Sequence, residues 1–119
     1  MVIDADQGRS RAVRRGARRL AKAGFAILER NWRCELGEID IVAREGAALV
    51  VCEVKTRRGL NYGSPLESVT YRKLATLRRL VGRWLQEHEV TPAAVRIDVI
   101  GVICPHRGAP TVDHVRGVA

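Results

Sequence analysis

The sequence predicts an α/β fold in which two helices flank a β-sheet. Apolar residues recur at helical spacing over residues 9–23 and again over 65–87. Residues 37–57, GEIDIVAREGAALVVCEVKTR, alternate apolar with polar or β-branched side chains on both sides of a turn, which is typical of a β-hairpin. Residues 95–103, VRIDVIGVI, are apolar almost throughout, as in an interior strand. With 119 residues, the chain has room for one domain.

The first helix is expected over residues 9–23, after a loose tail at residues 1–8, and Gly24 is placed to end it. This segment carries seven cations and no acid. Such a run is often only a solvated face, but like charges four residues apart repel, and seven exceed what solubility needs. Contacts with nucleic-acid phosphates are therefore expected from three of these residues, Arg14, Arg15 and Arg18.

Residues 25–34 predict the first strand, which should pair antiparallel with the hairpin through a turn at Glu35-Leu36. Asn31 is expected at a bulge or bend of this strand. Trp32 could stack on a base, but a buried or half-buried position is the favoured interpretation.

The hairpin turn is expected at Gly46-Ala47, where glycine supplies the positive φ that a type II′ turn requires first. Position i then pairs with position 93 − i, so two cross-strand pairs are predicted: Asp40 with Glu53, and Glu38 with Lys55. Side chains alternate across a strand, so these four residues should share one, acidic face. The other face should be core, formed by Ile39, Ile41, Val50, Cys52 and Val54.

Two carboxylates about 5 Å apart repel by about 3 kcal/mol at an effective dielectric near 20. A Mg²⁺ or Mn²⁺ ion would offset that repulsion, because such ions are held by one or two carboxylates, water and substrate phosphate. Asp40 and Glu53 are therefore the candidate ligands. Lys55 is placed to orient or deprotonate a water molecule, or to neutralise charge on a phosphate. A Glu-x-Lys sequence on an exposed strand is more often a solvated pair, and this interpretation stays open.

The loop over residues 56–65 is basic and glycine-rich, and Arg57 and Arg58 are expected to contact backbone phosphate. Ser64-Pro65-Leu66-Glu67 forms a capping box that predicts the start of the second helix. That helix should pack on the sheet and present a second basic surface that includes Arg72 and Arg79.

Asp98 is the only acid in the strand predicted over residues 95–103. A carboxylate that is hydrogen-bonded beside Arg96 or a helix end is favoured over metal ligation. A short edge strand is expected over residues 111–116. The three cysteines, Cys34, Cys52 and Cys104, have no metal-binding spacing and are expected to be reduced.

The charge balance of the chain points to a polyanionic partner. Lys and Arg number 21 against 13 Asp and Glu, which gives a net charge of +8 and a pI near 10.4. Nucleic acid is the leading candidate. No apolar run reaches transmembrane length and no hydrophobic signal region is seen, so the expected location is the cytoplasm, without a membrane partner.

Five short motifs resemble the YraN-type (UPF0102) family of small bacterial proteins, which is similar to Holliday-junction resolvases of the PD-(D/E)XK nuclease superfamily. They are RNWRC at 30–34, GEID at 37–40, EVKTR at 53–57, Pro65-x-Glu67, and RIDV at 96–99. The resemblance covers roughly residues 8–116. It implies a restriction-endonuclease-like αβββαβ core with a mixed central sheet flanked by helices.

The resemblance also implies a metal-dependent endonuclease site, in which Asp40, Glu53 and Lys55 are catalytic. Mg²⁺ or Mn²⁺ would be held by Asp40, Glu53 and the backbone carbonyl of Val54. Branched or damaged DNA is the substrate class that the resemblance implies. Resolvase-like enzymes act as dimers, but no stretch of this chain demonstrates self-association.

One position departs from the family pattern. Gly-Glu is usual in the first helix, and the matching pair here is Gly16-Ala17. The missing glutamate implies weaker metal binding unless Glu38 or Glu67 acts as an auxiliary acid. A second hypothesis therefore stands beside the nuclease: a nucleic-acid-binding module of a repair or recombination complex, with weak or no catalysis.

Overall fold

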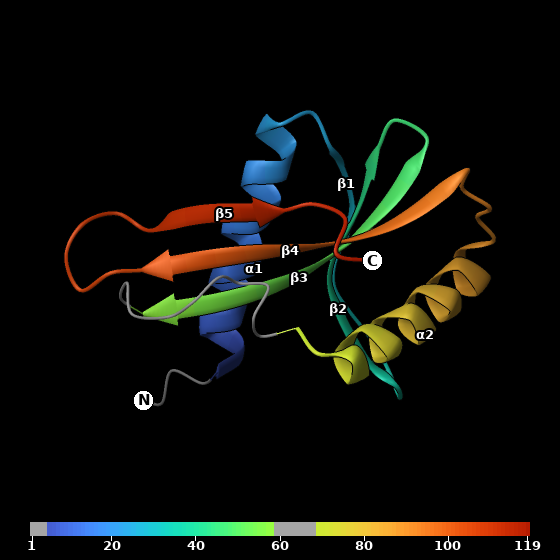
Figure 1. The fold of residues 1–119 in the computed structure, drawn as a ribbon, viewed down its shortest axis with the longest axis horizontal. Coiled ribbons are helices and arrows are strands. Elements are labelled where there is room, and N and C mark those ends of the chain that lie inside the picture. The colour runs from blue at the N-terminus through green and yellow to red at the C-terminus, as the bar shows by residue number, and fades with distance from the viewer. Residues whose placement is uncertain (1–4, 59–68) are drawn as a thin grey trace.

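The computed structural model describes residues 5–58 and 69–119 of the chain. This described part of the chain contains two helices and five strands, which follow one another in the order αβββαββ (Figure 1). Their bounds are α1 Ala5–Lys22, β1 Ala26–Cys34, β2 Gly37–Glu45, β3 Ala48–Arg58, α2 Tyr71–His88, β4 Ala94–Cys104 and β5 Thr111–Val115. No helix in these residues is both long and apolar enough to cross a membrane.

The five strands form one mixed sheet in the order β1-β2-β3-β4-β5. Only the β3–β4 pair is parallel, because the chain crosses from β3 through α2 before it enters β4. β4 lies between β3 and β5, so its predicted interior position is confirmed. The predicted α/β architecture, a mixed sheet flanked by helices, is also confirmed.

The hairpin between β2 and β3 has the predicted register where it is regular. The pairs run from Glu45↔Ala48 to Ile41↔Cys52, and each sums to 93. Gly46 has a φ of 59°, which is the positive φ predicted for the first central residue of the turn.

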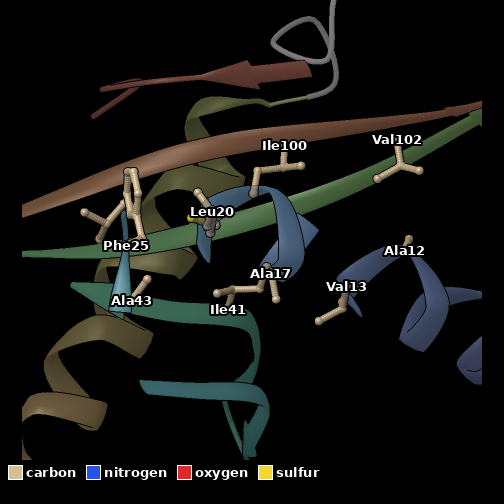
Figure 2. Packing of buried hydrophobic residues seen from close by; sticks show 11 residues of the cluster. Ala12, Val13, Ala17, Leu20, Phe25, Ile41, Ala43, Ile100 and Val102 are labelled. Atoms are coloured by element: carbon tan, nitrogen blue, oxygen red, sulfur yellow. The ribbon is translucent and has the colours of Figure 1, made fainter. Parts of the chain in front are cut away.

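The sheet is buried on both faces, which differs from the predicted hairpin with one acidic and one core face. On one face, α1 covers Ile100 and Val102 of β4 (Figure 2). The same cluster includes Val50 and Cys52 of β3. On the opposite face, α2 packs on a second cluster that includes Leu49 and Val51. The side chains alternate along β3, so the two helices lie on opposite sides of the sheet.

β1 and β2 change faces together near Asn31. Ile41 belongs to the α1-side cluster, whereas Ile39 belongs to the α2-side cluster beside its partner Trp32. The prediction that Ile39 and Ile41 share a face is therefore wrong. Asn31 has a φ of 54°, so the strand departs from regular β geometry between the flanking pairs, as its predicted bend anticipates. Trp32 is buried, as expected.

Two predicted helix boundaries are corrected. α1 begins at Ala5, so residues 5–8 are helical instead of part of a loose tail. α2 begins at Tyr71, where the Thr70 side chain accepts the Lys73 N–H at 3.1 Å as an N-cap. Val69 and Thr70 are outside the helix that was predicted to run on from residue 65. The predicted capping box at Ser64–Glu67 lies outside the described residues.

Asp98 fixes the end of the chain against β4. Its fully buried carboxylate accepts hydrogen bonds from Arg96 Nε at 2.8 Å and Nη2 at 3.0 Å, and from the Gly117 N–H at 2.8 Å. His114 Nε2 lies 2.7 Å from Oδ2. Burial opposes ionisation of Asp98, but the bonds from Arg96, Gly117 and His114 outweigh it and hold the pKa of the carboxyl below its usual value. The predicted structural role beside Arg96 is confirmed.

Candidate functional site

A pocket of about 420 Å³ lies between the hairpin and α2. Its floor comes from β2 and β3, and one wall comes from the first half of α2, which is drawn in yellow in Figure 1. The structure brings the four predicted polar residues of the hairpin together here: Glu38, Asp40, Glu53 and Lys55. The other lining residues are Gly37, Val54, Lys73, Thr76, Leu77 and Leu80.

Asp40 occupies the point where β2 and β3 separate. The ladder between these strands ends at Ile41↔Cys52, so the predicted pairs of Asp40 with Glu53 and of Glu38 with Lys55 are not part of it. Instead, Oδ2 of Asp40 accepts the Val54 N–H at 2.8 Å. The side chain thus takes the place of a backbone acceptor, and it is only 1% exposed. The Asp40 carboxylate is therefore inserted between β2 and β3.

The main chain of Val54 faces the gap that opens where β2 and β3 separate. Its N–H donates to Asp40, and the N–H and C=O of a strand residue point to the same edge of the strand. The Val54 carbonyl therefore points toward β2, at the level of the Asp40 carboxylate. Its side chain packs on the α1-side cluster, away from the pocket.

Glu53 is the second buried acid of the pocket, at 5% exposure. Oε1 of Glu53 lies 3.5 Å from Lys55 Nζ and 3.2 Å from Lys73 Nζ. A buried carboxylate requires such partners, because its desolvation is costly without an opposite charge. The two ammonium groups therefore compensate the buried charge of Glu53, whereas Asp40 is hydrogen-bonded to the main chain.

Lys73 is a charged residue of the pocket that the hairpin pattern does not predict. It lies in the first turn of α2, four residues before Leu77 and seven before Leu80, both of which are buried against the sheet. A cation at the start of an apolar stripe with this i, i+4, i+7 spacing lies on the side that faces the sheet. This spacing predicts that Lys73 faces the sheet, but it does not predict that Lys73 lies beside Glu53.

Of the two candidate auxiliary acids, the structure describes only Glu38. Glu38 lines the pocket, and its Oε2 lies 3.0 Å from Arg33 Nε. Glu67 lies outside the described residues. Ala17, at the position matched to the family glutamate, is buried on the α1 side and borders a different cleft. The structure therefore does not place position 17 at the Asp40–Glu53 pocket, because α1 covers the opposite face of the sheet.

The predicted phosphate-contacting residues fall into separate groups. Arg72 and Arg79 are exposed on α2, four residues before and three residues after Thr76 of the pocket, so they flank it. Arg57 follows Glu53 and Lys55 at alternate positions of β3, on the same face, and Arg58 points to the other face. The remaining three residues, on α1, lie across the sheet from the pocket: Arg14, Arg15 and Arg18.

The donor atoms of the pocket suit a hard cation. The pocket is lined by two buried carboxylates, and a backbone carbonyl is directed at the gap between β2 and β3. These groups offer oxygen ligands, which Mg²⁺ and Mn²⁺ prefer. Within residues 5–58 and 69–119, no three His, Cys, Asp or Glu side chains are grouped so that they could hold a metal. Any ion here would therefore need water or a substrate oxygen to complete its coordination.

Comparison with known proteins identifies the family to which this chain is similar. A model of the uncharacterised protein family UPF0102 matches residues 14–102. The chain belongs to this family. Its members include a UPF0102 protein of Kineococcus radiotolerans, 59% identical over 103 residues that cover 86% of this chain and 84% of the relative. The UPF0102 protein of Streptomyces coelicolor is 60% identical over 105 residues, 87% of this chain and 81% of the relative.

A third UPF0102 protein, from a Nocardioides species, is 57% identical over 102 residues, 86% of this chain and 82% of its own. The family predicted from the five short motifs is thereby confirmed. The match includes β2, β3 and α2, so the segments that build the pocket of this UPF0102 chain lie within the part that the family model covers.

Proposed function

We propose that this UPF0102 protein is a divalent-metal-dependent endonuclease that acts on DNA, with branched or damaged DNA as its substrate class. The observation that carries the proposal is the insertion of Asp40 between β2 and β3, beside the buried Glu53 and its lysine partners. A structural ion pair would not require a second buried carboxylate in the same pocket, since each buried charge adds a desolvation cost.

The ligands of the ion would be Asp40, Glu53 and the Val54 carbonyl. A bound Mg²⁺ or Mn²⁺ ion supplies Lewis acidity toward a phosphodiester and its attacking water. Asp40 is held in orientation by the Val54 N–H, so it need not reorganise when an ion binds.

The lysines and the α2 wall would act on the phosphate itself. An ammonium group has three donors and no acceptor, so Lys55 can donate to phosphate oxygens and offset the charge that develops on them. Its side chain is 26% exposed, which leaves it accessible to a substrate entering the pocket. Leu77 and Leu80 of α2 make part of the wall apolar, which strengthens these electrostatic interactions.

The second candidate is a nucleic-acid-binding module that does not cleave. The contacts of Glu53 with Lys55 and Lys73 favour it, because an ion would have to compete with two ammonium groups for this carboxylate. In that case the pocket charges would be a structural network, and the basic surfaces would account for binding.

A cleavage assay separates the two candidates. Linear, flapped and four-way-junction DNA are incubated with the protein in Mg²⁺, in Mn²⁺ and in EDTA. The nuclease predicts metal-dependent product that is absent in EDTA. Tight, salt-sensitive binding without product in either metal contradicts it and supports the binding module.

Lys73→Gln is expected to tighten Mn²⁺ binding several-fold. The substitution removes a cation 3.2 Å from Glu53 Oε1 that an incoming ion must displace. The side chain of Lys73 is 41% exposed, so solvent screens the pair and the gain stays modest. Mn²⁺ titration followed by electron paramagnetic resonance measures it, with the exposed Arg78→Gln on the same helix as the control.

A further inference from the structure

The exposed side of α1 carries a continuous group of cations that the pocket does not use. This group, termed here the α1 surface, comprises Arg11, Arg14, Arg15, Arg18, Arg19 and Lys22, all exposed. Residues 11 and 22 are separated by about 16 Å along a helix that rises 1.5 Å per residue. A B-DNA strand presents a phosphate about every 3.4 Å along the helix axis, so several phosphates match this length.

The cations of the α1 surface lack the partners that other arginines have. Arg33, Arg83 and Arg96 each lie within 3.0 Å of a carboxylate oxygen. Among the described residues, no carboxylate makes an ion pair with any cation of the α1 surface, although Arg19 Nη1 donates to the Val112 carbonyl at 3.4 Å. Like charges spaced i, i+4 on a helix repel each other, and an added polyanion would relieve this repulsion.

Clefts border α1 on two sides. One, of about 700 Å³, lies against β1 and includes Arg14, Arg18 and Arg30. Glu29 also borders this cleft, but its Oε1 is engaged by Trp84 Nε1 at 2.9 Å and lies 3.2 Å from His88 Nε2, both on α2. The other cleft, of about 390 Å³, lies against β5 and is lined by Arg15, Arg18, Arg19, Lys22, Pro110, Thr111 and Val112.

The α1 surface and the pocket face opposite directions. α1 packs on the side of the sheet that carries Val50 and Cys52, and the pocket opens on the α2 side with Glu53 and Lys55. In Figure 1, α1 passes behind the strands whereas α2 lies at the lower right. A single straight duplex seated at the pocket therefore does not also cover the α1 surface.

We propose that the α1 surface is a second nucleic-acid contact, so that one chain holds two duplex segments, one on each face of its sheet. The partner is duplex backbone, because this surface offers cations without the Asn or Gln amides that commonly read base edges. The inference rests on the proposed nucleic-acid partner but does not require cleavage.

The test measures how many short duplexes one chain binds. A 15-base-pair duplex in excess is mixed with the protein in EDTA at low salt, and the stoichiometry is determined by analytical ultracentrifugation. Wild type is expected to bind two duplexes per chain. Arg14→Gln/Arg15→Gln/Arg18→Gln is expected to bind one, and to lower the slope of log K against log salt by about 2 to 3.

The matched control removes the same number of positive charges from positions outside the α1 surface. Arg44→Gln/Arg78→Gln/Arg107→Gln replaces three exposed arginines that are outside α1 and the pocket, and it is expected to keep two duplexes per chain. Saturation of wild type at one duplex, loss of all binding in the α1 variant, or an unchanged α1 variant each overturns the inference. Binding to phosphatidylserine vesicles without binding to duplex also overturns it. This experiment does not measure cleavage, so its result does not depend on whether the protein is a nuclease.

Discussion

Asp98→Asn is expected to lower the free energy of unfolding by about 3 kcal/mol, because it removes the charge of a fully buried carboxylate and with it the ion pair to Arg96, whose side chain is partly exposed. The same change weakens the hydrogen bond that the Gly117 N–H donates to residue 98, and it weakens the contact of residue 98 with His114. These two contacts hold β5 and the residues after it against β4. Glu45 lies 2.9 Å from Arg96 and retains part of the compensation. Urea unfolding measures the change.

Asp113→Asn is the control for this prediction, because it makes the same chemical change at an exposed position of β5. Its effect should stay within about 0.5 kcal/mol, as for most surface substitutions. A loss below about 0.5 kcal/mol in Asp98→Asn would contradict the anchoring role.

The same carboxylate predicts a pH dependence. The pKa of Asp98 is lower in the folded protein than in the unfolded chain, where an aspartate titrates near about 3.9. Its stabilisation is therefore present above that pH and is lost as the pH falls through the folded value. Wild type should lose stability between about pH 5 and pH 2 more steeply than Asp98→Asn does. Parallel curves for the two proteins would exclude Asp98 as a cause.

Asp40→Asn is expected to reduce metal-dependent cleavage by at least about a hundredfold. Asparagine keeps an oxygen that can accept the Val54 N–H, so the strand junction should persist, but the charge that attracts a divalent ion is lost. Losses of 10- to 100-fold are typical even for groups that only support a metal ligand, which makes this figure a lower bound for a direct ligand. Single-turnover cleavage in Mn²⁺ measures the effect.

DNA affinity distinguishes a catalytic loss from a folding loss in Asp40→Asn. Affinity measured in EDTA should stay within about twofold of wild type, because the arginines that we propose to contact phosphate are unchanged. Asp113→Asn should cleave at the wild-type rate. Undiminished cleavage by Asp40→Asn would remove Asp40 from the mechanism.

Much of the fold could be predicted because the periodicity of apolar residues reports burial directly. The interior strand β4 and the hairpin register were predictable from an apolar run and from the glycine in the turn. The start of α1 could not be predicted, because residues 5–8 precede the apolar stripe that marks a helix. The face change at Asn31 could not be predicted either, because strict alternation assigns Ile39 and Ile41 to one face.

The hairpin residues of the candidate site could be predicted, but Lys73 and the arrangement of the side chains could not. Alternation along β3 correctly places Glu53 and Lys55 on one face. The separation of β2 from β3 at Asp40, and the arrival of Lys73 from a different element, depend on tertiary packing. Helical position alone also cannot tell that Arg14 and Arg79 lie on opposite faces of the sheet, since this depends on which face each helix covers.

Crystals grown with Mn²⁺ test the central claim most directly, because anomalous scattering locates the ion independently of any activity. The account predicts one anomalous peak within about 2.5 Å of carboxylate oxygens of Asp40 and Glu53, with the Val54 carbonyl directed at it and Lys73 Nζ moved away from Glu53. Glu53 still held by Lys55 and Lys73, with no peak between the two acids at saturating Mn²⁺, would contradict it.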